Sequence, residues 1–251
     1  MDKIKAYLNR IGYRGTPRPD FNTLHHLQRL HLQTIPYENL DIVRGIPISL
    51  EIDAIYDKIV TRRRGGYCFE LNALFAWLLR SLGFSVTDYF ARFLKDEPEI
   101  PMRRHRVLKA SCADGNFLCD VGVGLAVPRE PMPLTTGKVS RQSNEKYILE
   151  KDDFLGNVLC EWHNDTWRRL YAFTEEPQIE KDFIAVSYYC ENHPDSVFKA
   201  QDMVHIFTEK GRKSVAGREV RLFSDSCVEV LQPATEAAYH ELLYVHFGIQ
   251  L

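Results

Sequence analysis

The sequence predicts an α+β protein with a helical bundle first, a strand-rich middle second and a small mixed segment last. Three observations predict this order. Apolar residues recur at helical spacing through the first third of the chain, short apolar runs broken by turn residues follow, and a capped helical pattern comes near the end. A chain of 251 residues, of which 45% are hydrophobic, can bury a large core without disulfides or metals.

Four helical segments are expected in the first third. In three of them, apolar residues recur on one face at helical spacing. These residues are Ile4, Leu8 and Ile11, then Leu24, Leu27 and Leu30, then Ile52, Ile55 and Ile59. Asn22 and Thr23 are the expected caps of the second segment, and Ser49 begins the third. Residues 69–82 form the strongest helical pattern, and Gly83 ends it because glycine readily adopts the left-handed conformation there.

Strands are expected where short apolar runs alternate with turn residues. The runs cover residues 84–94, 105–111, 117–121, 146–149, 158–160 and 167–173. Ala113-Asp114-Gly115-Asn116 predicts a hairpin turn between the second and third runs. Pro128, Pro131 and Pro133 predict an irregular crossing after that hairpin.

The last fifty residues give weaker signals. Residues 202–208 and 219–231 have a mixed pattern that favours neither helix nor strand. A last helix is expected over residues 236–247, with Thr235 as its N-cap and Gly248 as its terminator.

Charge and hydropathy exclude several classes of protein. Lys and Arg number 32 against 34 Asp and Glu, without a basic stripe, so no nucleic-acid partner is expected. The longest apolar run covers only residues 73–79, whereas a membrane-spanning helix needs about 20 residues, so no membrane partner is expected. The first residues lack a secretory pattern, and the six cysteines lack the spacing of a zinc site. We therefore expect a cytoplasmic protein with reduced thiols and no metal.

Cys68 differs from the other five cysteines because of its neighbours. It follows two glycines in Arg64-Gly65-Gly66-Tyr67-Cys68 and directly precedes the strongest helical pattern. The glycines allow a tight turn and close approach of a ligand. Unpaired N–H groups at a helix start favour a thiolate and can also stabilise an oxyanion. Cys68 is therefore the candidate nucleophile.

A nucleophilic thiol needs a base, and the base needs an orienting group. His105 begins one expected strand, and Asp120 lies near the end of the next. If the turn at residues 113–116 closes a hairpin, these two residues are near neighbours, joined by a diagonal or bulged contact. The alternative is that His105 caps a strand and Asp120 is an ordinary turn carboxylate, and spacing alone leaves both interpretations open.

Gly122-Val123-Gly124 lacks the third glycine of a dinucleotide loop, so it predicts a turn or an approach site for an acyl group.

Taken in order, these segments resemble the arylamine N-acetyltransferase family. Residues 32–41 resemble its IPxENL segment, and residues 64–72 match its RGGxCxExN nucleophile signature. His105-Arg106-Val107-Leu108 resembles the family's histidine strand, and Asp120-Val121-Gly122-Val123-Gly124 resembles its DVGxG segment. Residues 167–173 and 193–198 resemble later landmarks of the family.

The resemblance implies a cysteine-protease-like catalytic core divided into three domains. These are a helical bundle over residues 1–83 that carries the nucleophile, a β-barrel-like domain over residues 84–195 that carries the histidine and aspartate, and an α/β lid over residues 196–251. It also implies that Cys68, His105 and Asp120 form a catalytic triad.

The resemblance further implies an activity. Such an enzyme transfers an acetyl group from acetyl-CoA to an aromatic amine or hydrazine, or to the oxygen of an N-hydroxyarylamine, by a ping-pong mechanism through an acetyl-cysteine, and serves xenobiotic metabolism. Arg103, Arg104 and Gly124 are the candidate contacts of CoA. The alternative for Arg103 and Arg104 is a solvated surface pair. Phe69, Phe93 and Val123 are the candidate contacts of the acceptor, where aromatic walls stack on an aryl ring. Val123 departs from the aromatic residue that many members carry at its position, which leaves the acceptor preference open, with a roomier pocket as one alternative.

Other functions fit the same residues. Cys-His-Asp groups also serve cysteine proteases, transglutaminases and amide synthases that close macrolactams. A non-enzymatic CoA-binding or interaction module is a further alternative. Arg64 and Glu38 are expected to form a buried ion pair that holds the nucleophile turn, and Glu70 and Asn72 to act structurally at the helix start.

Overall fold

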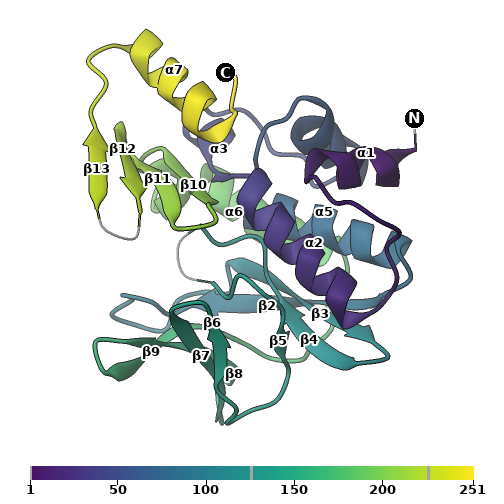
Figure 1. The fold of residues 1–251 in the computed structure, drawn as a ribbon. Coiled ribbons are helices and arrows are strands. Elements are labelled where there is room, and N and C mark those ends of the chain that lie inside the picture. Colours follow the sequence, from purple (N-terminus) through teal and green to yellow (C-terminus); the bar gives the residue numbers. More distant parts are fainter. Residues whose placement is uncertain (1, 125–126, 225–226) are drawn as a thin grey trace.

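The computed structural model describes residues 2–124, 127–224 and 227–251. Helices from the first third lie above a barrel-like sheet, and a smaller sheet with the C-terminal helix lies beside them (Figure 1). The predicted α+β architecture is therefore confirmed.

Most helices of the first third lie where apolar periodicity predicts them. They are α1 (Lys3–Arg10), α2 (Phe21–Thr34), α3 (Leu40–Val43), α4 (Ile52–Tyr56) and α5 (Cys68–Ser81). The expected caps of α2 are wrong, because its N-cap is Asp20, whose carboxylate accepts a hydrogen bond from the Thr23 N–H at 2.8 Å. Asn22 and Thr23 lie inside the first turn. The third pattern begins at Ile52 and continues into a π-helical turn, Asp57–Thr61.

An antiparallel eight-stranded sheet forms the lower half of the molecule. Its strand order is β5-β4-β3-β2-β9-β8-β7-β6. The strands are β2 (Ser85–Phe93), β3 (His105–Cys112), β4 (Gly115–Cys119), β5 (Met132–Pro133), β6 (Ser140–Gln142), β7 (Glu145–Asp152), β8 (Gly156–His163) and β9 (Thr166–Phe173). The helix α5 packs on β2 and β3. Its first turns lie close to the open end of the β3–β4 hairpin, where Asn72 contacts Asp120.

A second sheet joins residues far apart in the sequence. Its order is β1-β10-β11-β12-β13, from β1 (Tyr37–Glu38), β10 (Met203–Phe207), β11 (Arg212–Ala216), β12 (Glu219–Phe223) and β13 (Val228–Leu231). Residues 225–226 of the mixed segment lie outside the described residues. The sequence pattern does not predict β11, because the strand begins with the three polar residues Arg-Lys-Ser and lacks a run of apolar residues. The last helix, α7 (Glu236–Phe247), has the predicted cap Thr235, and Gly248 ends it at φ 69°.

The helix α6 (Asp182–Asn192) also escapes prediction. It buries only Phe183, Ser187 and Cys190, while Ile184 and Tyr188 are exposed, so its sequence has no clear apolar stripe. A single turn of 3-10 helix, Val197–Lys199, follows it.

The predicted domain boundaries fall between elements. One lies between α5 and β2, and the other lies between α6 and the 3-10 turn. Contacts nevertheless cross both boundaries, since β1 pairs with β10 and Phe183 of α6 packs against Phe69 of α5. The three-domain division stays a prediction.

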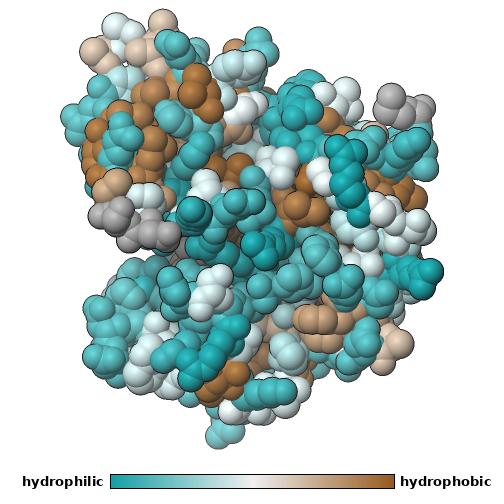
Figure 2. Space-filling model, in the orientation of Figure 1, coloured by the Kyte–Doolittle hydropathy of each residue, from teal (hydrophilic) through white to brown (hydrophobic). Residues whose placement is uncertain are grey.

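Apolar surface gathers at one edge of the smaller sheet. Figure 2 shows brown atoms over β13 and its surroundings, whereas the face over the barrel-like sheet is largely hydrophilic. Val228 and Val230 of β13 are exposed there. No helix in the described parts of the chain is long and apolar enough to cross a membrane.

Candidate active site

The loop before α5 is shaped by two glycines. A side chain at Gly65 would lie 2.1 Å from the Pro36 carbonyl oxygen, and one at Gly66 would lie 3.0 Å from Cβ of Glu70. Only a residue without a side chain fits against Pro36. The loop therefore passes close to Pro36 and places Cys68 as the first residue of α5, where the residue is only 3% exposed.

A buried network of ion pairs lies behind this loop. Arg64 donates to Glu38 at 3.0 and 2.8 Å and to Asp41 at 2.9 Å. Lys58 pairs with Asp41 at 2.8 Å and with Glu70 at 2.9 Å. The predicted Arg64–Glu38 pair is thus confirmed, as one part of a larger network. A paired and hydrogen-bonded set of charges can remain buried, whereas one charge left alone is strongly unfavourable.

Glu70 connects this network to the nucleophile. Its Oε2 accepts a hydrogen bond from the Tyr67 N–H at 3.1 Å, directly before Cys68. Burial raises the pKa of Glu70, while the Lys58 ammonium opposes that rise. Burial would lower the pKa of Lys58, but the surrounding carboxylates of Glu70, Glu38 and Asp41 outweigh it and raise that pKa. The predicted structural role of Glu70 agrees with this geometry.

The β3–β4 hairpin brings the histidine and the aspartate together. Leu108 pairs with Cys119 in the register of this hairpin, so Asp120 comes opposite Val107. Val107 and His105 are two residues apart and therefore lie on the same face of β3, which places His105 diagonally across from Asp120. The His105 Nε2 atom lies 2.7 Å from Oδ2 of Asp120, and both side chains are at least 95% buried. The expected diagonal arrangement is therefore present.

Asn72 of α5 holds the aspartate from the other side. Its Nδ2 donates to Oδ1 of Asp120 at 3.0 Å and to the Arg106 carbonyl at 2.6 Å, while its Oδ1 accepts from the Val121 N–H at 3.0 Å. The Gly122 N–H also donates to Oδ1 of Asp120, at 2.9 Å. Because α5 also carries Cys68, Asn72 couples the nucleophile helix to the His–Asp pair.

Cys68 itself lies in a low-dielectric environment. Its Sγ lies 3.8 Å from the Arg104 carbonyl oxygen. Burial raises the pKa of the Cys68 thiol, and the charges of Cys190 and Asp120 raise it further, while the N–H groups of Phe69 and Arg106 oppose the rise. The Phe69 N–H at the start of α5 favours the thiolate, as expected, but burial acts more strongly in the opposite direction. A thiolate here requires a protonated partner.

A cavity of about 300 Å³ opens onto the thiol. Of the residues predicted to act, Cys68, His105, Phe93, Arg104, Val123 and Gly124 line it. Tyr37, Lys95, Glu97, Phe198, Met203 and His205 complete most of its described wall. These six escaped sequence analysis, because most reach the cavity only through the pairing of β1 with β10 and through the turn after α6.

The other predicted contact residues lie elsewhere. Phe69 is fully buried between Tyr67 and Phe183, behind the nucleophile. Arg103 pairs with Glu176 at 3.2 Å on the surface, outside the described lining of the cavity. Arg104 lines the cavity while paired with Glu97. Their roles toward acceptor and CoA stay predictions.

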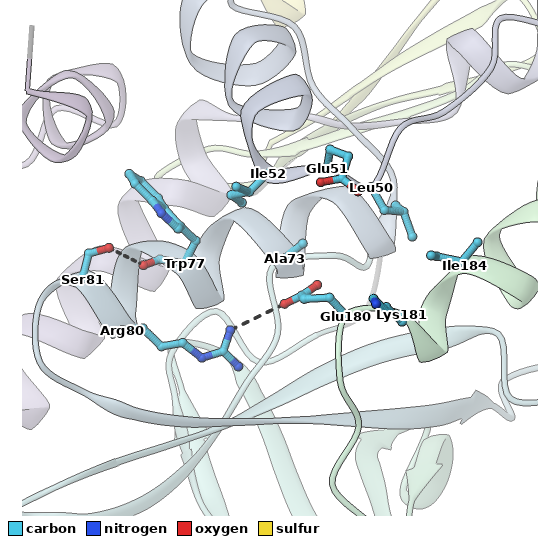
Figure 3. Close-up of a pocket in the computed structure, with 10 residues that line it drawn as sticks. All are labelled: Leu50, Glu51, Ile52, Ala73, Trp77, Arg80, Ser81, Glu180, Lys181 and Ile184. Atoms are coloured by element: carbon cyan, nitrogen blue, oxygen red, sulfur yellow. Dashed lines mark hydrogen bonds and ion pairs between the residues drawn. The ribbon is translucent and has the colours of Figure 1, made fainter.

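A larger cavity, of about 500 Å³, lies beside α5 but away from this chemistry (Figure 3). Trp77 and Ile52 supply apolar wall, while Arg80 and Glu180 form an ion pair of 3.6 Å at its rim. None of the predicted catalytic side chains lines it. Among the described residues, no group of three His, Cys, Asp or Glu side chains is arranged to hold a metal ion.

Comparison with known proteins decides the family. A model of the N-acetyltransferase family matches residues 20–251. The arylamine N-acetyltransferase of Mycobacterium tuberculosis (strain ATCC 25618 / H37Rv) is 36% identical over 254 residues, covering 99% of this chain and 89% of that protein. The chain belongs to the arylamine N-acetyltransferase family. It is therefore an acyltransferase, and the resemblance drawn from the sequence is confirmed.

Solved structures of arylamine N-acetyltransferases superimpose over 98% or more of this chain. The M. smegmatis enzyme has a TM-score of 0.92 at 35% identity, with 100% of this chain and 93% of that one covered. The Mycobacterium marinum enzyme in complex with CoA has a TM-score of 0.90 at 33% identity, covering 98% and 92%. At these identities the likeness extends beyond the fold to the family.

Proposed function

We propose that this arylamine N-acetyltransferase moves an acetyl group from acetyl-CoA to aromatic amines and hydrazines through an acetyl-cysteine on Cys68. The observation that carries the proposal is that Cys68 and His105 line one cavity, with Asp120 hydrogen-bonded to Nε2 of the imidazole. Family membership and the M. marinum relative solved with CoA support the donor.

The first half-reaction begins with a proton transfer. The Asp120 carboxylate is hydrogen-bonded to Nε2 of His105. We therefore assign the other ring nitrogen, Nδ1, as the base that takes the proton from Sγ of Cys68. The resulting imidazolium is stabilised by the Asp120 carboxylate and stabilises the thiolate in turn. The thiolate attacks the thioester carbonyl carbon, the bond from that carbon to the CoA sulfur breaks, and CoA leaves as a thiol with the proton from His105.

The second half-reaction reverses these roles. The amine nitrogen attacks the acetyl carbonyl carbon, and the bond from that carbon to Sγ of Cys68 breaks. The amine loses one proton to His105, which restores the thiolate–imidazolium pair. An N-hydroxyarylamine delivers its oxygen to the same carbon, which gives O-acetylation. Release of CoA before the acceptor binds makes the kinetics ping-pong.

The cavity wall provides contacts for both substrates. Tyr37, Phe93 and Phe198 form an aromatic wall on which an aryl ring can stack. Lys95 and Arg104 bring positive charge to the same cavity, which suits the phosphates of CoA, with Arg103 nearby in the sequence. All six cysteines are free, which supports a reducing compartment such as the cytoplasm.

Mass spectrometry of the protein mixed with acetyl-CoA alone tests the proposal. We expect a stable increase by one acetyl group on the peptide that contains Cys68, and its disappearance on addition of aniline with formation of acetanilide. A protein that releases CoA only when the amine is also present, without an acetylated intermediate, would rule out the ping-pong scheme. Hydrolysis without amide formation would instead favour a thioesterase.

A further inference from the structure

Asn39 is a buried polar side chain that the mechanism above does not use. It directly follows β1 and is only 1% exposed. Its Nδ2 donates hydrogen bonds to the Phe198 carbonyl at 2.8 Å and to the Gln201 carbonyl at 2.9 Å, and its Oδ1 accepts one from the Met203 N–H at 2.7 Å. All three partners lie in one segment, 159 to 164 residues further along the chain.

The amide of Asn39 matches this segment in donors and acceptors. Both N–H bonds of Nδ2 have a carbonyl as acceptor, and Oδ1 has an N–H as donor. The three backbone groups run from the 3-10 turn to the first residue of β10. One side chain therefore holds this backbone at three points. An aspartate in its place could keep only the hydrogen bond from Met203, because a carboxylate does not donate to a carbonyl.

Other ties between this segment and the first third of the chain are weaker or lie elsewhere. β1 pairs with β10 at only two residue positions. The Asn39 N–H adds one longer hydrogen bond, of 3.3 Å, to the Met203 carbonyl. Asp202 adds an ion pair with Arg44 at 3.3 Å, and the Arg44 side chain is partly exposed. Of these ties, the Asn39 side chain alone contacts both Phe198 and Met203.

The segment that Asn39 holds forms part of the cavity wall. Phe198 and Met203 line the cavity that contains Cys68. The Phe198 ring also lies edge-on to the Tyr67 ring, with 6.0 Å between centroids. An aryl ring packs favourably on such an apolar and aromatic wall. The side chains of the triad come from α5 and the β3–β4 hairpin instead, so a shift of this segment changes the wall and leaves the triad in place.

We propose that Asn39 is a positioning residue for the acceptor, because it holds Phe198 and Met203 where the aryl ring stacks in the second half-reaction. The inference rests on the proposed function. Asn39 is not among the described residues of the cavity wall, so it acts through Phe198 and Met203 rather than by touching a substrate. Its loss should weaken the reaction of the acetyl-enzyme with aromatic acceptors and spare the acetylation of Cys68.

The test compares two hydrazines on preformed acetyl-enzyme. Protein is acetylated with acetyl-CoA, freed of CoA, and mixed with low concentrations of phenylhydrazine or of methylhydrazine, which lacks the ring. The ratio of the two rates of acetyl loss reports on the wall, because the intrinsic reactivity of each hydrazine is the same for every variant. We expect Asn39→Ala to lower this ratio about tenfold, the size of one lost aromatic contact, and to change the rate of Cys68 acetylation by less than about threefold.

Three further variants sharpen the result. Phe198→Ala should lower the ratio by a similar factor, and Asn39→Ala combined with it should lower the ratio no further, because both changes remove the same contact. Asn39→Asp keeps the size of the side chain and the acceptor for the Met203 N–H. It should lower the ratio as Asn39→Ala does, which keeps the test decisive if the alanine variant fails to fold. Asn157→Ala removes another buried asparagine, which donates to Glu175 at 3.2 Å from β8, and should leave the ratio unchanged.

The outcomes separate this inference from the proposed function. An unchanged ratio in both Asn39 variants would overturn the role of Asn39 while acetyl transfer itself stands. The inference would also be overturned if the double variant lost the product of the two single effects, or if Asn157→Ala lowered the ratio as much as Asn39→Ala. A wild-type protein that forms no acetyl-enzyme would overturn the proposed function, and the inference with it.

Discussion

Removal of the Glu38 carboxylate tests whether the buried ion-pair network supports the fold rather than the reaction. In Glu38→Ala, Arg64 loses two hydrogen bonds, of 3.0 and 2.8 Å, and the Leu40 N–H loses its acceptor at 2.9 Å. Breaking a buried pair costs about 3–5 kcal/mol. The lower end of this range applies to Glu38→Ala, because Arg64 keeps its hydrogen bond to Asp41 at 2.9 Å.

This loss converts into a large change in melting temperature. For a chain of this size, each kcal/mol lowers the melting temperature by about 2–4 °C, so a loss of about 3 kcal/mol predicts a fall of roughly 6–12 °C. Thermal unfolding followed by circular dichroism measures it. Acetylation of Cys68, measured well below the melting temperature, should stay within about threefold of wild type, because Glu38 does not line the cavity as described.

Two matched variants complete the experiment. Glu38→Gln keeps an acceptor oxygen and should lose less stability than Glu38→Ala. Asp53→Ala removes an exposed partner of Lys3, and surface pairs contribute only about 0–1 kcal/mol, so its melting temperature should fall by less than about 4 °C. The reasoning is refuted if Glu38→Ala melts like Asp53→Ala, or if acetylation collapses while the melting temperature holds.

Three other perturbations have defined outcomes. Asp120→Asn should lower the rate of Cys68 acetylation by about 10²–10⁴-fold with little change in melting temperature, because the amide cannot stabilise the imidazolium; unchanged acetylation would remove Asp120 from the mechanism. Gly122→Ala places a Cβ 2.8 Å from Cα of Cys68, so it should cost about 1–3 kcal/mol in urea unfolding; a variant as stable as wild type would contradict the close approach. Despite its burial, Asp41 has a lowered pKa because of its cationic partners, so its contribution to stability is present at neutral pH and lost as pH falls through the folded-state pKa. The gap in melting temperature between wild type and Asp41→Asn should therefore narrow from pH 7 to pH 3, and a constant gap would disprove this linkage.

Much of the site could be predicted because its parts are local in sequence. The glycine pair, Cys68 and the helix that follows are consecutive, and the β3–β4 hairpin closes within a few residues of its turn. A hairpin register can be estimated from its turn alone, so the diagonal position of Asp120 relative to His105 follows within one residue. The Arg64–Glu38 pair could be predicted from the rule that a buried charge is paired with an opposite charge.

The residues that escaped prediction depend on long-range pairing. His205 reaches the cavity because β10 pairs with β1, and these strands lie more than 160 residues apart in the sequence. No local pattern distinguishes His205 from the other histidines. The pKa of Cys68 also depends on tertiary structure, because burial by surrounding elements outweighs the N–H groups at the start of α5. Phe69 is a predicted acceptor contact, yet it packs against Phe183 of α6, a helix that no sequence pattern predicts.

The claim on which the mechanism depends is that His105, rather than the helix start, makes Cys68 nucleophilic. Alkylation by iodoacetamide across pH 5–9, with each cysteine peptide quantified by mass spectrometry, measures this directly. The exposed Cys227 provides an internal reference in every sample.

At pH 6, we predict that Cys68 of wild type reacts at least tenfold faster than Cys227. In His105→Gln, Cys68 should react more slowly than Cys227, because burial then raises its pKa without an imidazolium to oppose it. Equal reactivity of Cys68 in wild type and His105→Gln would contradict the account.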